Sequence, residues 1–200
     1  MSWKTKTVKS LGGSVILVAA LSLTGCVPTS NPYPEIPRFA KSGGQTQAEL
    51  NAKLATIPGL KFQKSSGGKP NVKGNTGFTF HFELDSGYRI ADPAGLVDYL
   101  SRSAWSVRDG YMPNSAIYIE CLCNVADNLD LVVAGEDAGW VPKDSQLHRG
   151  PAENGYTDVN VWVSADNTSS ERRGAVANRE RLGTWPGDAP AVPENLVVPR

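Results

Sequence analysis

A run of strictly alternating apolar and polar residues sets the strongest limit on how this chain folds. The run reads Phe78, Thr79, Phe80, His81, Phe82, Glu83, Leu84 and Asp85. A period of two is that of a β-strand with one buried face and one wet face, and it does not fit a helix. The chain must therefore build a sheet with a core on one side, into which the three phenylalanines point.

Capping signals predict a helix on each side of this strand. Thr46-Gln47-Ala48-Glu49 fits a capping box, and an apolar stripe over 50–57 follows it before Pro58-Gly59 ends the helix. Asp92-Pro93 places an acidic N-cap before a proline at the first helical position, and the second helix ends before Gly110.

The remaining patterns predict further strands at 60–64, 116–123 and 158–163, a third helix over 127–138, and a mobile hairpin loop at 65–77. This order predicts an α+β two-layer sandwich, with a mixed sheet of about four strands and the helices on one face. Two right-handed crossovers would join the strands, and a ferredoxin-like topology is one arrangement of this kind.

The first 26 residues carry an export pattern. Lys4, Lys6 and Lys9 precede an uncharged, mostly apolar run over 11–23, which would rise only about 20 Å as a helix against a hydrocarbon core of about 30 Å. The run ends in Leu23-Thr24-Gly25-Cys26, which resembles the lipobox of bacterial prolipoproteins. The resemblance implies cleavage before Cys26, a diacylglyceryl group on its sulfur, and a membrane-anchored, extracytoplasmic mature protein. The alternative is a plain secretory signal followed by an ordinary buried or free cysteine.

Four segments are therefore predicted. Residues 1–25 form a lipoprotein signal peptide, and 26–45 form a Pro-, Gly- and Ser-rich tether whose nineteen residues after Cys26 would reach up to about 60 Å. Residues 46–164 form the globular α+β domain. Residues 165–200 are polar, contain four prolines and show little periodicity, which predicts a mostly disordered tail.

Charge limits the partners. Cleavage would remove three of the 20 basic residues and none of the 20 acidic ones, which leaves a mildly acidic mature chain. A nucleic-acid partner is not predicted, because it needs a clustered basic footprint. Four lysines around the Gly-rich loop would either contact anionic lipid or wall polymer or simply be solvated: Lys61, Lys64, Lys69 and Lys73.

The polar side of the alternating strand is the one candidate binding site. His81, Glu83 and Asp85 lie on that side and would form an acid/base cluster or a weak cation site, although any half-exposed strand carries polar groups there. No catalytic residue, metal site or cofactor is predicted, because no recognisable nucleophile motif, second ligand pair or cofactor motif accompanies them.

Cys121 and Cys123 invite a redox or metal hypothesis. Residues two apart in a strand lie about 6.6 Å apart with parallel side chains, which is poor geometry for a disulfide. Two buried thiols are therefore predicted, with a strained or intermolecular disulfide as the alternative.

Together the patterns predict a lipid-anchored envelope protein that acts without catalysis as a binding or accessory module. Its partners would be the membrane, through Cys26, and an envelope protein or wall polymer. The alternative is a small envelope hydrolase or transferase that uses the polar face around His81, Glu83 and Asp85.

Overall fold

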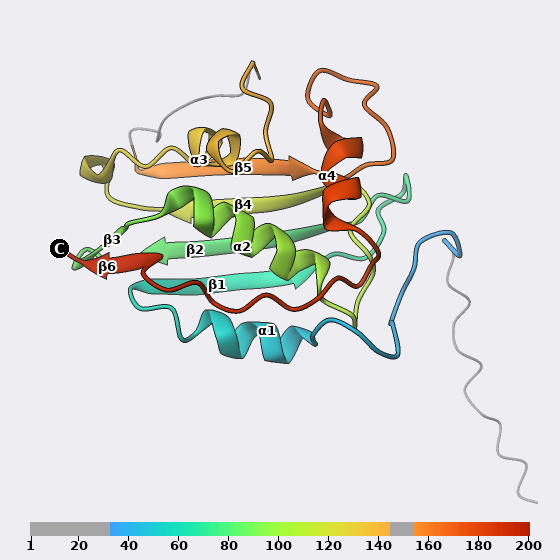
Figure 1. The fold of residues 1–200 in the computed structure, drawn as a ribbon, viewed down its shortest axis with the longest axis horizontal. Coiled ribbons are helices and arrows are strands. Elements are labelled where there is room, and N and C mark those ends of the chain that lie inside the picture. Colours follow the sequence, from blue (N-terminus) through green and yellow to red (C-terminus); the bar gives the residue numbers. More distant parts are fainter. Residues whose placement is uncertain (1–32, 145–153) are drawn as a thin grey trace, which may run out of the picture. The chain divides into compact units, whose positions relative to one another are not determined.

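In the computed structural model, which describes residues 33–144 and 154–200, a four-stranded sheet runs in the order β1-β2-β4-β5 (Figure 1). Its strands are β1 (Leu60–Gly67), β2 (Gly77–Leu84), β4 (Ala116–Leu122) and β5 (Tyr156–Trp162). The β2 and β4 strands are parallel, and the two outer pairs are antiparallel. A two-stranded ribbon joins β3 (Tyr88–Ile90) to β6 (Val197–Pro199). The predicted α+β sandwich with a mixed sheet is confirmed.

Helices α2 (Pro93–Trp105) and α3 (Leu131–Asp137) lie over one face of the sheet, and α1 (Gln47–Leu54) lies beside β1 (Figure 1). The capping box at Thr46 and the Asp92 N-cap are both present, as predicted. The third helix begins later than predicted. A short 3₁₀ turn (Val125–Asp127) comes first, Asn128 takes a left-handed φ of 48°, and Asp130 then caps α3.

The core lies between the sheet and the helices. Phe78, Phe80 and Phe82 are fully buried on the helix side of β2, as the alternation predicts. The rings of Phe78 and Phe80 lie 5.0 Å apart, and Phe62 of β1 lies 5.0 Å from Phe82. Aromatic pairs at this separation add stabilisation beyond the area they bury.

Two details of the predicted topology are wrong. The β2-α2-β4 unit has its parallel strands side by side, whereas a ferredoxin-like fold splits such a unit with another strand. The second crossover is also absent, because α3 connects β4 to an antiparallel neighbour. Strand β1 extends three residues beyond its predicted end, since residues 65–67 continue the pairing with β2 after a bulge at 62–64.

The described part of the predicted tether is packed on the domain. Ile36 is only 3% exposed, and Gln45 is buried with its side-chain amide donating to Ser106 Oγ. Backbone hydrogen bonds join Ala40 to Arg108 and Gln45 to Ser106. The globular unit therefore begins at Tyr33 rather than at residue 46. The signal peptide, Cys26 and the first part of the tether lie outside the described residues.

The predicted disordered tail is also wrong, since residues 165–200 belong to the same unit. Helix α4 (Ala175–Leu182) contacts β5, and Asn178 Nδ2 donates to the carbonyl oxygens of Trp140 and Trp162. Leu196 and Val197 are buried where the chain returns to pair with β3. Hydrophobic periodicity did not predict this packing, because many of the contacts that attach residues 165–200 are polar.

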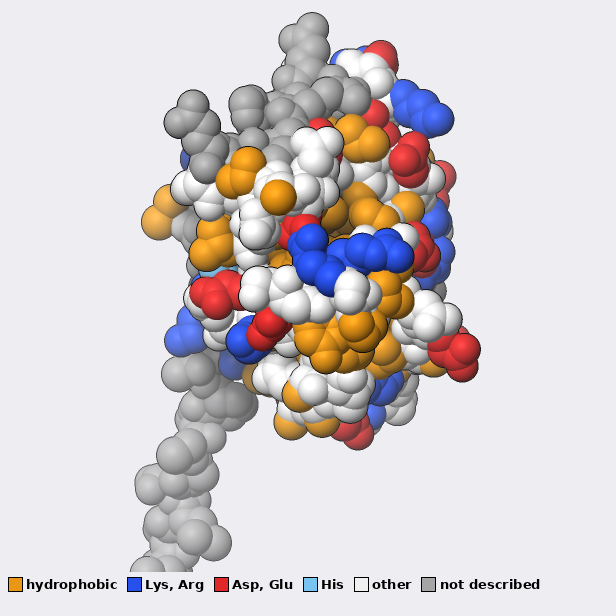
Figure 2. Space-filling model, turned by 90° about the vertical axis from the view of Figure 1, so that its left-hand side faces the viewer, with side chains coloured by type: hydrophobic (Ala, Val, Ile, Leu, Met, Phe, Trp, Pro, Cys, Tyr) orange, Lys and Arg blue, Asp and Glu red, His pale blue; other side chains and the backbone are white. Residues whose placement is uncertain are grey.

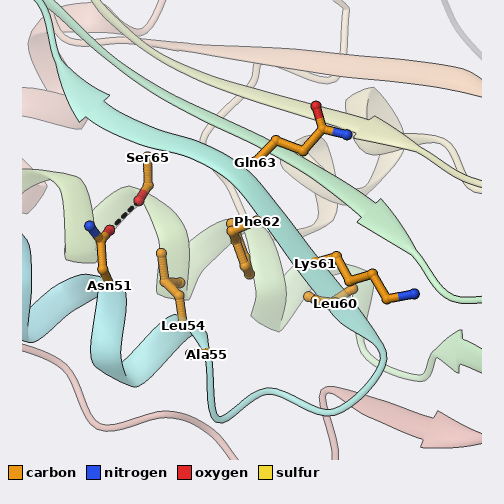
Figure 3. Close-up of a pocket in the computed structure, with 8 residues that line it drawn as sticks. All are labelled: Asn51, Leu54, Ala55, Leu60, Lys61, Phe62, Gln63 and Ser65. Atoms are coloured by element: carbon orange, nitrogen blue, oxygen red, sulfur yellow. Dashed lines mark hydrogen bonds between the residues drawn. The ribbon is translucent and has the colours of Figure 1, made fainter.

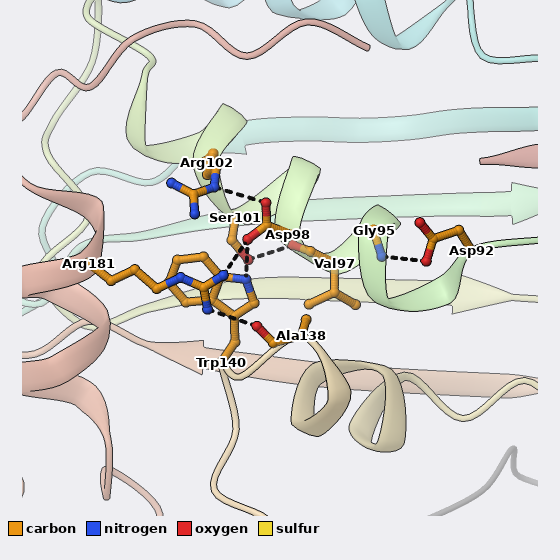
Figure 4. A network of polar contacts seen from close by, with 9 residues as sticks. All are labelled: Asp92, Gly95, Val97, Asp98, Ser101, Arg102, Ala138, Trp140 and Arg181. Carbon is orange, nitrogen blue, oxygen red and sulfur yellow. Dashed lines mark hydrogen bonds and ion pairs between the residues drawn. The ribbon is translucent and has the colours of Figure 1, made fainter. Parts of the chain in front are cut away.

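Figure 4 shows the polar network that fixes α4 to α2 and α3. The Arg181 guanidinium lies 3.9 Å from the centre of the Trp140 ring and 2.7 Å from Asp98 Oδ1. Trp140 Nε1 donates to the same oxygen, and Arg102 Nε donates to Asp98 Oδ2. One carboxylate thus contacts side chains from three segments.

No described helix is long and apolar enough to span a membrane.

Candidate functional site

The face of the sheet that points away from α2 and α3 carries a row of polar residues from four strands. His81 lies between Lys64 of β1 and Glu120 of β4, and Asp158 of β5 follows Glu120 in the register. His81 Nδ1 lies 3.1 Å from Glu120 Oε2, and about a third of each side chain is exposed. The outward position of His81 agrees with the alternation.

Two tyrosine rings flank this row. Tyr118 and Tyr156 are half-buried on the same face, next to Thr79 and Leu122 in the register. Burial, and then the negative charges of Glu120 and Asp158, raise the pKa of the Tyr156 hydroxyl. The two carboxylates therefore lie close enough to act on one aromatic hydroxyl. We call Tyr118, Glu120, Leu122, Tyr156 and Asp158, together with His81, the open sheet face.

A glycine makes room for one of these rings. A Cβ atom added to Gly77 would lie 2.6 Å from Cε2 of Tyr118, closer than carbon atoms can approach. The Tyr118 ring therefore lies against Gly77 at the start of β2, where a larger residue would push the ring away.

The structure does not unite the predicted cluster of His81, Glu83 and Asp85. Each has its own partner: His81 contacts Glu120, Glu83 accepts a hydrogen bond from Gln63, and Asp85 accepts one from Lys61 Nζ at 3.0 Å. The Gly87 N–H and then Lys61 lower the pKa of Asp85. Asp85 thus stabilises the turn after β2 and faces a lysine rather than His81.

Sequence reasoning missed Glu120 as the neighbour of His81, and it missed Tyr156 and Asp158 as further members of the same face. Their strands are separated from β2 by whole helices, so only the register reveals the contact. The usable signal was the alternation in strands 116–123 and 158–163, which places Glu120 and Asp158 opposite the buried residues.

Cys121 and Cys123 are both buried and form no disulfide. The prediction of two buried thiols is therefore confirmed. Burial, and next the neighbouring Cys123, raise the pKa of Cys121 far above its usual range. Burial also raises the pKa of Cys123, whose thiol donates to the Gly155 carbonyl oxygen at 3.1 Å. Both groups stay protonated and unreactive at neutral pH.

Two cavities lie apart from this face. One of about 430 Å³ lies between α1 and β1, with Leu54 and Phe62 among its lining residues and the Asn51–Ser65 contact at one end (Figure 3). Another, of about 330 Å³, is lined by Arg89, Arg200 and several apolar side chains. It lies at the end of the domain that holds β3 and β6, where Figure 2 shows basic side chains gathered among hydrophobic ones.

Within residues 33–144 and 154–200, no group of three or more His, Cys, Asp or Glu side chains is placed to hold a metal ion. No protein-family model, curated protein or solved structure matches the chain. Cys26, the proposed lipidation site, lies outside the described residues. The geometry of the open sheet face and the N-terminal pattern therefore carry the argument about function.

Proposed function

We propose that this protein is a lipid-anchored bacterial envelope lipoprotein that binds an envelope protein through its open sheet face. The anchor rests on the lipobox resemblance at Leu23-Thr24-Gly25-Cys26. Binding rests on one observation: half-exposed tyrosine rings, an exposed Leu122 and paired carboxylates share a face that the described helices leave uncovered.

The composition of the open sheet face favours a partner surface that carries Arg or Lys. Tyr118 and Tyr156 offer ring faces to a cation, and Glu120 and Asp158 offer carboxylate oxygens on adjacent strands. A guanidinium that stacks on tyrosine while it pairs with a carboxylate uses both kinds of group. Leu122, which is 39% exposed at the end of β4, would add apolar contact area.

Within the part of the chain that the structure describes, the cluster on which the hydrolase or transferase alternative depends is not assembled. His81, Glu83 and Asp85 each contact a different neighbour, and none of them lines either of the two cavities named above.

Site-specific photo-crosslinking in cells tests the binding proposal. A photoreactive amino acid at position 118 or 122 is expected to give a discrete adduct with one envelope protein. The same probe at Glu180, which is exposed on α4, is the control and should give none. Glu120→Gln combined with Asp158→Asn should weaken the adduct at 122, whereas Glu180→Gln should not. Equal adducts at 122 and 180, or no adduct at 118 and 122, would overturn the proposal.

Membrane fractionation tests the anchor separately. Serine has no thiol to acylate, so Cys26→Ser is expected to move the processed protein out of the membrane fraction. Incorporation of labelled fatty acid should disappear at the same time. A processed mutant that stays in the membrane as completely as the wild type would refute lipid anchoring through Cys26.

A further inference from the structure

Two apolar side chains are unusually exposed at one end of the domain. Val72 is 95% exposed and Phe39 is 53% exposed. They belong to residues 33–41 and 68–76, which we call the tether end because the described chain begins there. Both segments lie at the right-hand end of Figure 1, away from the β3-β6 ribbon.

Hydrogen bonds join the two segments into one surface. Tyr33 Oη donates to the Asn71 carbonyl oxygen at 3.0 Å, and the Tyr33 ring lies against Gly74. Met112 links them further, because its N–H donates to Pro37 and its carbonyl oxygen accepts from Thr76 Oγ1. The exposed side chains are therefore carried by connected backbone.

The structure holds the backbone of both apolar residues in a defined conformation. Asn71 Oδ1 accepts from the N–H groups of Lys73 and Asn75, which closes a tight turn around Val72. Phe39 takes a left-handed φ of 55°, which is unfavourable for a bulky residue, while Arg38 stacks 4.3 Å over its ring. An exposed aromatic ring held by a strained backbone indicates a functional surface.

The charge of the tether end is opposite to that of the mature chain. Arg38, Lys41, Lys69 and Lys73 are exposed cations in its two segments, against the single acid Glu35. Among the described residues no carboxylate pairs with Lys41, Lys69 or Lys73. Basic side chains around exposed apolar ones are the composition of surfaces that bind anionic membranes.

Chain length places this surface near the proposed anchor. Seven peptide steps separate Cys26 from Tyr33, and in any conformation they span at most about 25 Å. The packing of residues 33–45 thus shortens the reach from the roughly 60 Å expected for an extended spacer. A domain held this close brings its tether end to the headgroups first.

We propose that the tether end docks on an anionic lipid bilayer. Val72 and Phe39 enter the headgroup boundary, while Lys69, Lys73 and Lys41 contact lipid phosphates. The inference rests on the proposed anchor, because a single exposed valine and phenylalanine with a few lysines would bind only weakly alone.

The test supplies the anchor chemically, so that its result does not depend on acylation in cells. The chain from Cys26 onward is joined through that thiol to a diacyl lipid and reconstituted in phosphatidylcholine vesicles with about 30% phosphatidylglycerol. An environment-sensitive fluorescent amino acid is placed at position 72, or at Ser86 in the exposed turn after β2 as control. Brominated lipids should quench the probe at 72 at least threefold more than the probe at 86.

Charge variants separate docking from simple proximity. Lys73→Glu is expected to reduce quenching at 72 by more than half, and vesicles without phosphatidylglycerol should do the same. The matched charge reversal Arg89→Glu, at an exposed position of β3, should leave the quenching at 72 unchanged. Equal quenching at 72 and 86, or quenching at 72 that ignores Lys73→Glu and lipid charge, would overturn the proposal. If the protein is not acylated in cells but the chemically anchored chain docks on vesicles, only the proposed anchor is rejected.

Discussion

The attachment of the C-terminal segment is tested most directly by Leu196→Ala. Leu196 is 2% exposed, and its carbonyl oxygen accepts a hydrogen bond from Ala91 N–H at 2.8 Å just before α2 begins. Truncation to alanine removes three carbon atoms, worth about 2.4 kcal/mol at roughly 0.8 kcal/mol each. A cavity would add to this loss. Because β6 lies in a short ribbon that can relax, we expect a total of about 2–3 kcal/mol.

Urea unfolding followed by tryptophan fluorescence measures this loss. With a slope of about 2 kcal/mol per molar, the midpoint should fall by roughly 1–1.5 M. The matched control is Glu194→Ala, which changes an exposed side chain two residues earlier and should leave the midpoint within about 0.25 M. Indistinguishable midpoints for Leu196→Ala and the wild type would show that the segment does not pack on the domain.

Three further predictions follow from the sheet. Phe80→Ala should cost about 3–5 kcal/mol in urea unfolding and His81→Ala less than about 1, and equal losses would mean that the faces of β2 are wrongly assigned. Cys121 and Cys123 should resist thiol reagents until urea unfolds the domain, and rapid labelling of the folded protein would contradict their burial. Because the pKa of Asp85 is lowered on folding, its carboxylate stabilises the fold above about pH 4, and this contribution is lost as the pH falls through the folded pKa. The difference in unfolding free energy between wild type and Asp85→Asn at pH 7 should therefore shrink at about pH 2, and a constant difference would refute it.

Strand alternation and helix caps were predicted correctly, because both depend on residues close together in the sequence. The alternation around Phe80 fixed the buried face of β2, and the Thr46 and Asp92 caps fixed two helix starts, because each depends on residues within one turn or strand. The start of α3 was predicted too early, because the 3₁₀ turn at Val125–Asp127 resembles a first helical turn.

Sequence could not predict what depends on contacts between distant segments. The partner of His81 is set by the β2-β4 register, 39 positions along the chain. The attachment of α4 to the domain depends on the Arg181 contacts with Trp140 and Asp98. A search for hydrophobic periodicity cannot detect such contacts. Polar and cation–π contacts can fix a segment that lacks an apolar stripe, so low periodicity alone is weak evidence of disorder.

The two proposed surfaces constrain each other through the direction of the strands. In Figure 1 the strands of the main sheet run between the tether end and the β3-β6 end. With the tether end on a bilayer, they would stand roughly upright, and the open sheet face would look sideways along the membrane. The tether end would occupy the bilayer while Tyr118 and Leu122 stayed accessible above it. A partner that reaches this face must then itself lie close to the membrane surface, so the crosslinked protein is expected to be a membrane protein or another anchored one. An adduct with a freely diffusing protein alone would contradict this orientation.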